Sequence, residues 1–352
     1  MLQVFLPAGI AQKRGRITVT IGIGIVGAGI MGADHARILH QGIAGATLAG
    51  IHDADRPRAE RLAAETGGPR LFETAAQLIG DPEIGAVLIA SPDETHAPLA
   101  LACIAAGKPV LCEKPLAATL AACRDILASE IAGGRRLVQV GYMRRFDPGY
   151  RAMRQSVAEG RLGAPLMMHC VHRNAVAPHY IGSDLVIANS MVHEFDVARF
   201  VLGEDFVAAS VTSPRASSNA PARQPQFAVL ETASGVVVDI EAFLDCQYGY
   251  DVRAELVCEK GSIALAPNPP VVVRQDGRDG FALAPDWRGR FLDAYREQMQ
   301  AWVTSAISGR PAAGSSAWDG YVASATAAAC LEARRTGAKV RINAGPRPDF
   351  YV

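Results

Sequence analysis

The stretch ITVTIGIGIVGAGIMG, residues 17–32, decides how this chain folds. It begins as an uncharged run of Ile, Val and Thr, which suits a strand buried on both faces of a parallel sheet. The run then enters Gly27, Gly29 and Gly32, which have the G-x-G-x-x-G spacing. Gly27 permits a tight turn, Gly29 lets the backbone approach a pyrophosphate, and Gly32 lets the next helix pack on the strand. The stretch therefore predicts a dinucleotide-binding turn.

An acidic residue further along the chain supports this interpretation. A second apolar run, residues 46–51, leads to Asp53, which lies 21 residues after Gly32. The fold places the acid that binds the adenosine ribose hydroxyls at about this distance. A carboxylate there repels a 2′-phosphate, so NAD is favoured over NADP, although Arg56 and Arg58 keep that preference moderate. The alternative is a helix-opening turn followed by an incidental acidic residue. If the stretch is a dinucleotide-binding turn, Ile30 and Met31 begin the helix whose N-terminus faces the cofactor phosphates.

Composition excludes several classes of protein. The 352 residues are 49% hydrophobic and 20% charged, with a formal net charge of zero, which describes a globular protein without a basic field for nucleic acid or an anionic membrane. No apolar run reaches the roughly 20 residues that span a bilayer. The seven cysteines include no C-x-x-C pair and no metal-ligand spacing, so we expect reduced thiols, no metal and a cytoplasmic location. Residues 1–16 are expected to be a disordered extension.

The pattern of elements changes near Gly141. Before it, short apolar runs alternate with helices, as in a doubly wound parallel sheet of the Rossmann type. After it, short strands at turn-rich intervals indicate an α+β domain with a large open, mostly antiparallel sheet. We therefore predict an NAD-binding domain over 17–141 and a substrate-binding and oligomerisation domain over 142–352. A long amphipathic helix is expected over 185–201, and the helices that close the chain could pack back on the first domain.

Two polar segments follow strands of the predicted parallel sheet, whose carboxyl ends face the ligand crevice. The first is the turn at residues 91–96, in which Pro92 and His96 are candidate cofactor contacts. The second is Glu113-Lys114-Pro115, where Glu113 is a candidate cofactor contact and the Lys114 ammonium could reach a substrate hydroxyl. On spacing alone, a surface lysine after a strand is the favoured interpretation.

Asn189, His193 and Asp196 have helical i, i+4 and i+7 spacing and are expected to share one face. A histidine near neutral pKa, oriented by its neighbours, is the usual general base for an alcohol. The alternative is a histidine satisfied within the core. Glu194 points away from that face and is left out of the predicted site. Asn174 and Tyr250 are further candidates for lining a polyol pocket, although both could be ordinary surface residues.

Together these residues resemble the Gfo/Idh/MocA oxidoreductase family, and within it the members that oxidise inositols. The glycine turn and Glu113-Lys114-Pro115 are typical of the whole family. More specific segments are LVQVGYMRRFDPGY (137–150), PLMMHCVHRN (165–174), VHEFDV (192–197), YGYD (248–251) and AWDGY (317–321). The resemblance extends from about residue 21 to residue 350.

The resemblance implies roles for individual residues. Lys114 looks like the lysine that contacts the substrate hydroxyl and the nicotinamide region, and His193 looks like the catalytic base. Met143 and Arg144 match a segment that lines the active site, and Asn174 matches a substrate contact. By the same resemblance the protein binds NAD and a small cyclic polyol or sugar, and forms a homotetramer through the open sheet.

One position departs from the family pattern. The inositol-oxidising members normally carry Asp four residues before the base, and this chain has Asn189, which can orient the ring but supplies no charge. The implied reaction is NAD-dependent oxidation of a secondary hydroxyl, with myo-inositol to 2-keto-myo-inositol (scyllo-inosose) as the leading case. The alternatives are the same chemistry on scyllo- or chiro-inositol or an aldose, or a catalytically weak NAD-binding sugar sensor.

Overall fold

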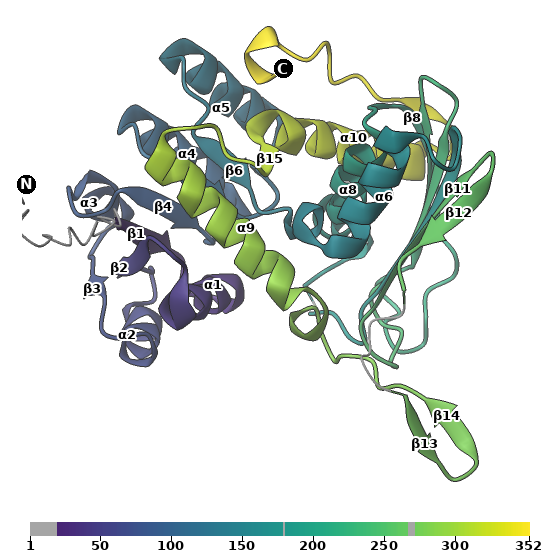
Figure 1. The fold of residues 1–352 in the computed structure, drawn as a ribbon, viewed down its shortest axis with the longest axis horizontal. Helices are drawn as coiled ribbons and strands as arrows, with labels where there is room; N and C mark the ends of the chain where they lie inside the picture. Colours follow the sequence, from purple (N-terminus) through teal and green to yellow (C-terminus); the bar gives the residue numbers. More distant parts are fainter. Residues whose placement is uncertain (1–19, 179, 267–271) are drawn as a thin grey trace, which may run out of the picture.

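Two seven-stranded sheets organise the molecule (Figure 1). The computed structural model describes residues 20–178, 180–266 and 272–352. The extension predicted over 1–16 and the start of the decisive stretch lie outside these residues. The observed pair of sheets confirms the predicted fold class.

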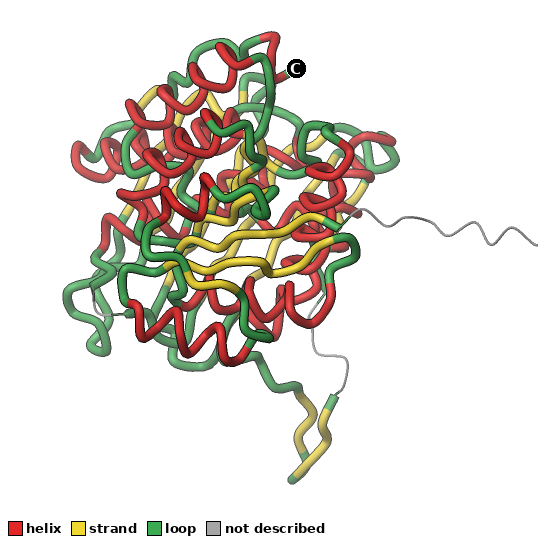
Figure 2. The backbone as a smooth tube through the Cα atoms, turned by 90° about the vertical axis from the view of Figure 1, so that its left-hand side faces the viewer, coloured by secondary structure: helices red, strands yellow, loops and turns green. Residues whose placement is uncertain are grey.

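The first sheet has the order β15-β6-β5-β4-β1-β2-β3, and its strands from β6 to β3 are parallel. Strand β1, which lies between β4 and β2, buries Ile23 and Ile25 completely, as expected for a strand covered on both faces. Figure 2 shows helices above and below the strands. The strands are β1 (Ile21–Val26), β2 (Ala46–His52), β3 (Arg70–Leu71), β4 (Ala86–Ile89), β5 (Val110–Cys112) and β6 (Val138–Val140); the helices are α1 (Ile30–Gly42), α2 (Arg56–Glu65), α3 (Ala75–Gly80), α4 (Asp93–Ala105) and α5 (Leu120–Gly133).

The second sheet has the order β12-β11-β7-β10-β9-β8-β16. Only the β7–β10 pair is parallel, and the other five pairs are antiparallel. Figure 1 shows α6, α8 and α10 on one face, with no helix of the described chain over the other. The strands are β7 (Pro165–Arg173), β8 (Phe206–Thr212), β9 (Gln226–Thr232), β10 (Val237–Phe243), β11 (Asp251–Cys258), β12 (Gly261–Ala264) and β16 (Val340–Arg341); the helices are α6 (Pro148–Glu159), α8 (Val192–Leu202) and α10 (Ala317–Thr336).

The end of the chain returns to the first sheet. Strand β15 (Ser315–Ser316) pairs antiparallel with β6, and α10 then packs against α5. A Cβ at Gly320 in α10 would lie 2.9 Å from both Leu116 Cβ and Val140 Cγ2, so only glycine allows this close approach. Helix α9 (Arg288–Ser308) lies beside α1, where the Ala44 N–H donates to Gln300 Oε1 at 2.8 Å.

The predicted helix over 185–201 is wrong in its first part. The chain there forms the short α7 (Ser183–Leu185) and then a π-helical turn, η2 (Val186–Ser190), before α8 begins. Such π-turns occur often at functional sites, and period-3.6 reasoning cannot detect them. Asn189 therefore lies in a different segment from His193, and the two do not share one helical face.

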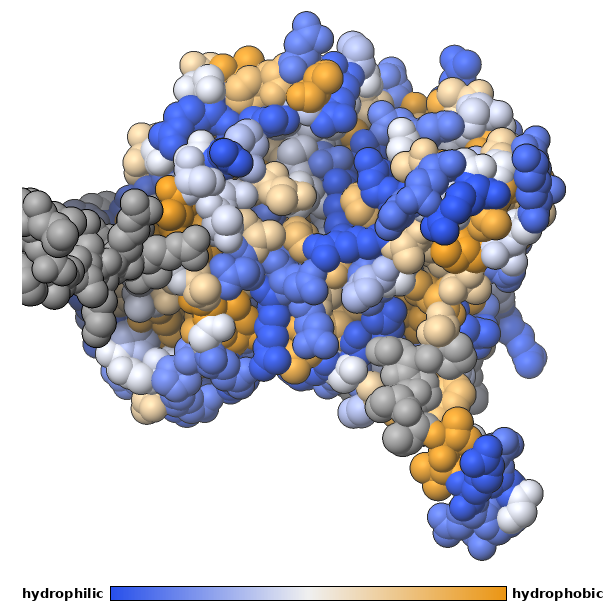
Figure 3. Space-filling view, in the orientation of Figure 1, coloured by the Kyte–Doolittle hydropathy of each residue, from blue (hydrophilic) through white to orange (hydrophobic). Residues whose placement is uncertain are grey.

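A hairpin of β13 (Val273–Gln275) and β14 (Arg278–Gly280) projects from the body of the protein (Figure 1). Figure 3 shows apolar side chains near its base and a polar tip. Val273 and Phe281 are among the exposed apolar residues of this arm. Over the described ranges, no helix combines the length and the apolar character needed to cross a membrane.

Candidate active site

A cavity of about 830 Å³ opens at the carboxyl ends of β1, β2 and β4. It lies where open parallel sheets bind their ligands. The wall of the cavity contains six of the residues predicted to bind the cofactor, which are Gly27, Gly29, Ile30, Met31, Asp53 and Pro92.

The three glycines of the turn each meet a different steric demand. Gly27 has φ +98°, and a Cβ there would lie 2.5 Å from the Ala90 carbonyl oxygen. A Cβ on Gly32 would lie 1.8 Å from the Gly27 carbonyl oxygen, so α1 packs on the turn only with glycine at this position. Around Gly29 the space is open to 4 Å. That opening beside the first N–H groups of α1 fits a pyrophosphate.

Asp53 lies at the end of β2, where the ribose-binding acid was predicted. Its Oδ2 accepts the Ala28 N–H at 2.6 Å, and its Oδ1 accepts the Asp55 N–H at 2.7 Å. Arg58 Nη1 lies 3.6 Å from the same carboxylate and neutralises part of its charge. The carboxylate is therefore fixed against the glycine turn. This arrangement fits an NAD ribose.

Two residues predicted as cofactor contacts instead support the loops around the site. His96 is buried, and its two ring nitrogens lie 2.7 Å from the Pro115 carbonyl oxygen and 2.9 Å from that of Ser91. Glu113 is also buried, with Oε1 2.6 Å from His35 Nε2. Neither side chain lines the cavity. Both predictions are corrected, because these polar groups are already satisfied by the protein.

Lys114 and Asn189 meet in the structure, although 75 residues separate them. Lys114 Nζ donates to the Asn189 carbonyl oxygen at 2.9 Å and to Oδ1 at 2.7 Å. The Asn189 side-chain amide donates in turn to Asp93 Oδ2 at 3.4 Å. Burial lowers the pKa of Lys114, Glu113 and Asp93 oppose that shift, and Arg144 adds to it. The prediction that Asn189 orients His193 is not supported, because its amide is taken by Lys114 and Asp93.

His193 is the second residue of α8. Its ring lies edge-on to Tyr142, with 6.0 Å between centroids, and 6.4 Å from the ring of His172. Its Nδ1 has no hydrogen-bond partner among the described residues. Burial lowers the pKa of His193 well below its ordinary value, and the charges of Arg144 and Lys114 and the nearby His172 lower it further. The imidazole is therefore neutral near pH 7.

Arg144 is part of a buried ion pair, which corrects its predicted role as a substrate contact. Its guanidinium pairs with Glu194, and both side chains are about 1% exposed. Glu194 Oε2 lies 3.0 Å from His172 Nδ1. Although burial raises the pKa of Glu194, the charge of Arg144 and the contact with His172 lower it to about 2. Glu194 was left out of the predicted site, and only its position next to the candidate base could have indicated it.

The remaining predicted residues lie around this ion pair. Tyr250 is buried, with its ring 6.0 Å from that of His172, and Met143 is also buried. Asn174 follows β7, and its Oδ1 has no partner among the described residues. Asp196 faces away from this cluster, because Arg145 donates to both of its carboxylate oxygens. The predicted face of Asn189, His193 and Asp196 is therefore not formed.

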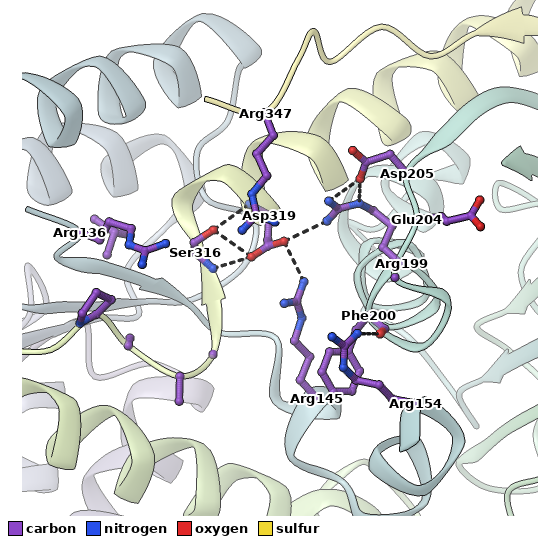
Figure 4. Close-up of a pocket in the computed structure, with 16 residues that line it drawn as sticks. Arg136, Arg145, Arg154, Arg199, Phe200, Glu204, Asp205, Ser316, Asp319 and Arg347 are labelled. Carbon is purple, nitrogen blue, oxygen red and sulfur yellow. Dashed lines mark hydrogen bonds and ion pairs between the residues drawn. The ribbon is translucent and has the colours of Figure 1, made fainter. Parts of the chain in front are cut away.

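A second cavity, of about 460 Å³, contains none of the predicted site residues (Figure 4). At its centre the Asp319 carboxylate, at the start of α10, lies 3.1 Å from both Arg145 and Arg199. The Ser316 N–H and Oγ donate to the same carboxylate. These contacts join the start of α10 to α8 and to η1 (Met143–Phe146). They therefore fix the helix that carries His193 relative to β15 and the first sheet.

Family comparisons agree with this geometry. Residues 21–142 match the oxidoreductase family GFO_IDH_MocA, NAD-binding Rossmann fold, and residues 154–342 match the C-terminal alpha/beta domain of the same family. The chain belongs to the Gfo/Idh/MocA oxidoreductase family. It is an NAD-dependent oxidoreductase of the class that acts on CH–OH groups.

Particular relatives are similar over nearly the whole chain. Inositol 2-dehydrogenase 1 of Saccharopolyspora erythraea is 51% identical over 95% of this chain and 99% of its own length. An inositol 2-dehydrogenase of Ralstonia nicotianae is 43% identical over 95% of this chain and 99% of its own. The crystal structure of myo-inositol dehydrogenase from Lactobacillus casei, in complex with NAD(H) and myo-inositol, has a TM-score of 0.91 and 30% identity over 95% of this chain and all of that one.

Proposed function

We propose that this protein oxidises one secondary hydroxyl of a cyclic polyol with NAD, and that myo-inositol is converted to 2-keto-myo-inositol. The observation that carries the proposal is the contact of Lys114 Nζ with Asn189, four residues before His193, which brings the ammonium and the imidazole to one site. The charge of Lys114 there lowers the pKa of His193. The similarity to inositol 2-dehydrogenases over 95% of the chain supports the choice of substrate.

The two side chains divide the chemistry between them. Two of the three Lys114 N–H donors are engaged by Asn189, which leaves one donor for the substrate hydroxyl oxygen. The hydroxyl proton passes to an imidazole nitrogen of His193, which is neutral and can accept it. When bound, NAD accepts the hydride from the carbon that bears this hydroxyl, so the C–OH becomes C=O. The buried ion pair of Arg144 and Glu194 holds α8, and with it His193, in place.

The alternative substrates to myo-inositol are scyllo-inositol, chiro-inositol and an aldose, and the shape of the pocket selects among them. The experiment follows NADH absorbance with NAD and each of these compounds, at pH 7 and pH 9. The His193→Ala variant is assayed in parallel, and Glu94→Gln, a change at an exposed residue, serves as the control. We expect turnover on an inositol that His193→Ala reduces by about 10²-fold or more, the range of general base catalysis.

The same panel of compounds also tests the alternative function, an NAD-binding sugar sensor with little or no catalytic activity. An NAD-binding sugar sensor would gain thermal stability with NAD and a polyol while producing no NADH. That outcome across the whole panel would overturn the dehydrogenase proposal.

We also propose that the protein is a homotetramer in the cytoplasm. The uncovered face of the second sheet carries an apolar row in which Met167 of β7 pairs with Val237 of β10 and Val257 of β11. Such a row favours burial against a second copy. The seven cysteines are all free thiols, as the reducing cytoplasm would keep them.

A further inference from the structure

Three segments distant in sequence meet beside the proposed catalytic lysine. Asp93 begins α4, Lys114 follows β5, and Asn189 lies in the π-turn η2. Asn189 bridges the other two, with Oδ1 2.7 Å from Lys114 Nζ and Nδ2 3.4 Å from Asp93 Oδ2. Asp93 is half-buried, whereas the next residue, Glu94, is exposed.

The polarity of the amide makes this chain of contacts directional. An ammonium can only donate, an ionised carboxylate can only accept, and an asparagine side chain has one end of each kind. Between Lys114 and Asp93, therefore, only one orientation of the Asn189 amide satisfies both neighbours. The carbonyl oxygen must face Lys114, and the NH₂ group must face Asp93.

We propose that Asp93 is a positioning residue, which acts through Asn189 to fix the Lys114 ammonium and to supply it with a negative charge. The inference rests on the proposed function and extends it to a residue outside the Lys114–His193 pair. Without the Asp93 carboxylate, the NH₂ group of Asn189 loses its charged acceptor, and the contact with Lys114 alone holds the amide in place.

The charged groups around Lys114 show why this contribution matters. Glu113, Asp93 and Glu194 raise the pKa of Lys114, while burial and Arg144 lower it. The Glu113 carboxylate also contacts His35, and the Glu194 carboxylate also contacts Arg144 and His172. Asp93, in contrast, is linked to Lys114 through a single amide. Among these acids it is therefore the one whose removal should affect Lys114 most selectively.

The test compares Asp93→Asn with the matched control Glu94→Gln and with the exchange variant Asp93→Asn/Asn189→Asp. Asp93→Asn keeps the shape of the side chain and an acceptor oxygen but removes the negative charge. We expect it to reduce kcat for polyol oxidation by about 10- to 100-fold, the range for a hydrogen bond to a charged group, with little change in NAD affinity. The exchange variant should recover most of that loss, because a carboxylate again faces Lys114. Glu94→Gln should behave as the unmodified protein.

A second measurement does not depend on turnover. The chain has only the lysines Lys13, Lys108, Lys114, Lys260 and Lys339, so ¹³Cε-lysine labelling gives few NMR signals, and Lys114→Met assigns the one of interest. We expect Asp93→Asn to lower the pKa of Lys114 and Glu94→Gln to leave it unchanged. Equal kcat and equal Lys114 titration in Asp93→Asn and the unmodified protein would overturn the proposal. If the unmodified protein oxidises no polyol, the proposed function fails, while the titration still decides the role of Asp93.

Discussion

His193 is kept neutral by its surroundings. Burial opposes its protonation, and the positive charges of Arg144 and Lys114 oppose it further. Glu194 is nearby, but its carboxylate is directed to Arg144 and His172 rather than to His193. A general base is useful only when it is unprotonated, so this arrangement favours proton removal at and below neutral pH.

The pH dependence of kcat/KM should report this environment. Because the pKa of His193 is below 6.5, the neutral base persists as pH falls through 6.5, and the acid limb should appear only at lower pH. Initial rates measured from pH 4.5 to 9 check this expectation, and His193→Ala should lack the acid limb. An acid limb centred at or above pH 6.5 would contradict the assigned environment.

The buried ion pair makes a separate prediction about stability. Glu194→Gln keeps the shape of the side chain but leaves the Arg144 charge without its partner in a site that is about 1% exposed. Such a loss typically costs about 3–5 kcal/mol. Glu159→Gln, which removes the surface pair with Arg161, should cost at most about 1 kcal/mol. Urea unfolding of the two variants measures the difference, and equal costs would refute the interpretation.

At the scale of elements, the glycine turn separates packing from cofactor binding. Gly32 is in contact with the backbone of Gly27, whereas Gly29 faces open space. The same methyl group should therefore have different consequences at two positions three residues apart.

Gly32→Ala should lower both thermal stability and NAD affinity, because its Cβ would lie 1.8 Å from a backbone oxygen. Gly29→Ala should leave thermal stability unchanged and weaken NAD binding, because its Cβ would occupy the space proposed for the pyrophosphate. Calorimetric unfolding without NAD and titration with NAD distinguish the two effects. Unchanged NAD affinity in Gly29→Ala would place the pyrophosphate elsewhere.

Local patterns of the sequence predicted the elements that depend on local physics. The turn at Gly27–Gly32 and the acid at Asp53 follow from chain geometry near β1 and β2, and the structure has both. Roles that depend on distant partners could not be predicted in this way. Arg144 was placed at the substrate by resemblance alone, and no local pattern indicated its partner Glu194, which lies 50 residues later. Asn189 was assigned to His193 because a π-turn was interpreted as a regular helix.

At the scale of the whole molecule, the second sheet has one face covered by helices and one face without them (Figure 1). The row of Met167, Val237 and Val257 crosses three neighbouring strands of the uncovered face. An apolar row on an uncovered sheet face favours burial against another surface, and we propose that the protein assembles through this face.

Met167→Arg should therefore dissociate the proposed tetramer without unfolding the chain, since Met167 is 42% exposed in the isolated chain. Ile131→Arg, at a residue 43% exposed on α5, is the matched control and should leave the assembly unchanged. Light scattering coupled to size-exclusion chromatography gives the mass of each variant. A Met167→Arg protein of unaltered mass would place the interface on another surface.

Strand β15 has a consequence for how the protein is made. The edge of the NAD-binding sheet at β6 is completed by Ser315 and Ser316, and α10 then covers Leu116 and Val140 through Gly320. A nascent chain therefore emerges from the ribosome with this sheet edge open until residues 315 and 316 have been translated. For the same reason, recombination that transfers only the first 141 residues to another protein would transfer a sheet without its edge strand β15. We therefore expect the two domains to be exchanged as one unit.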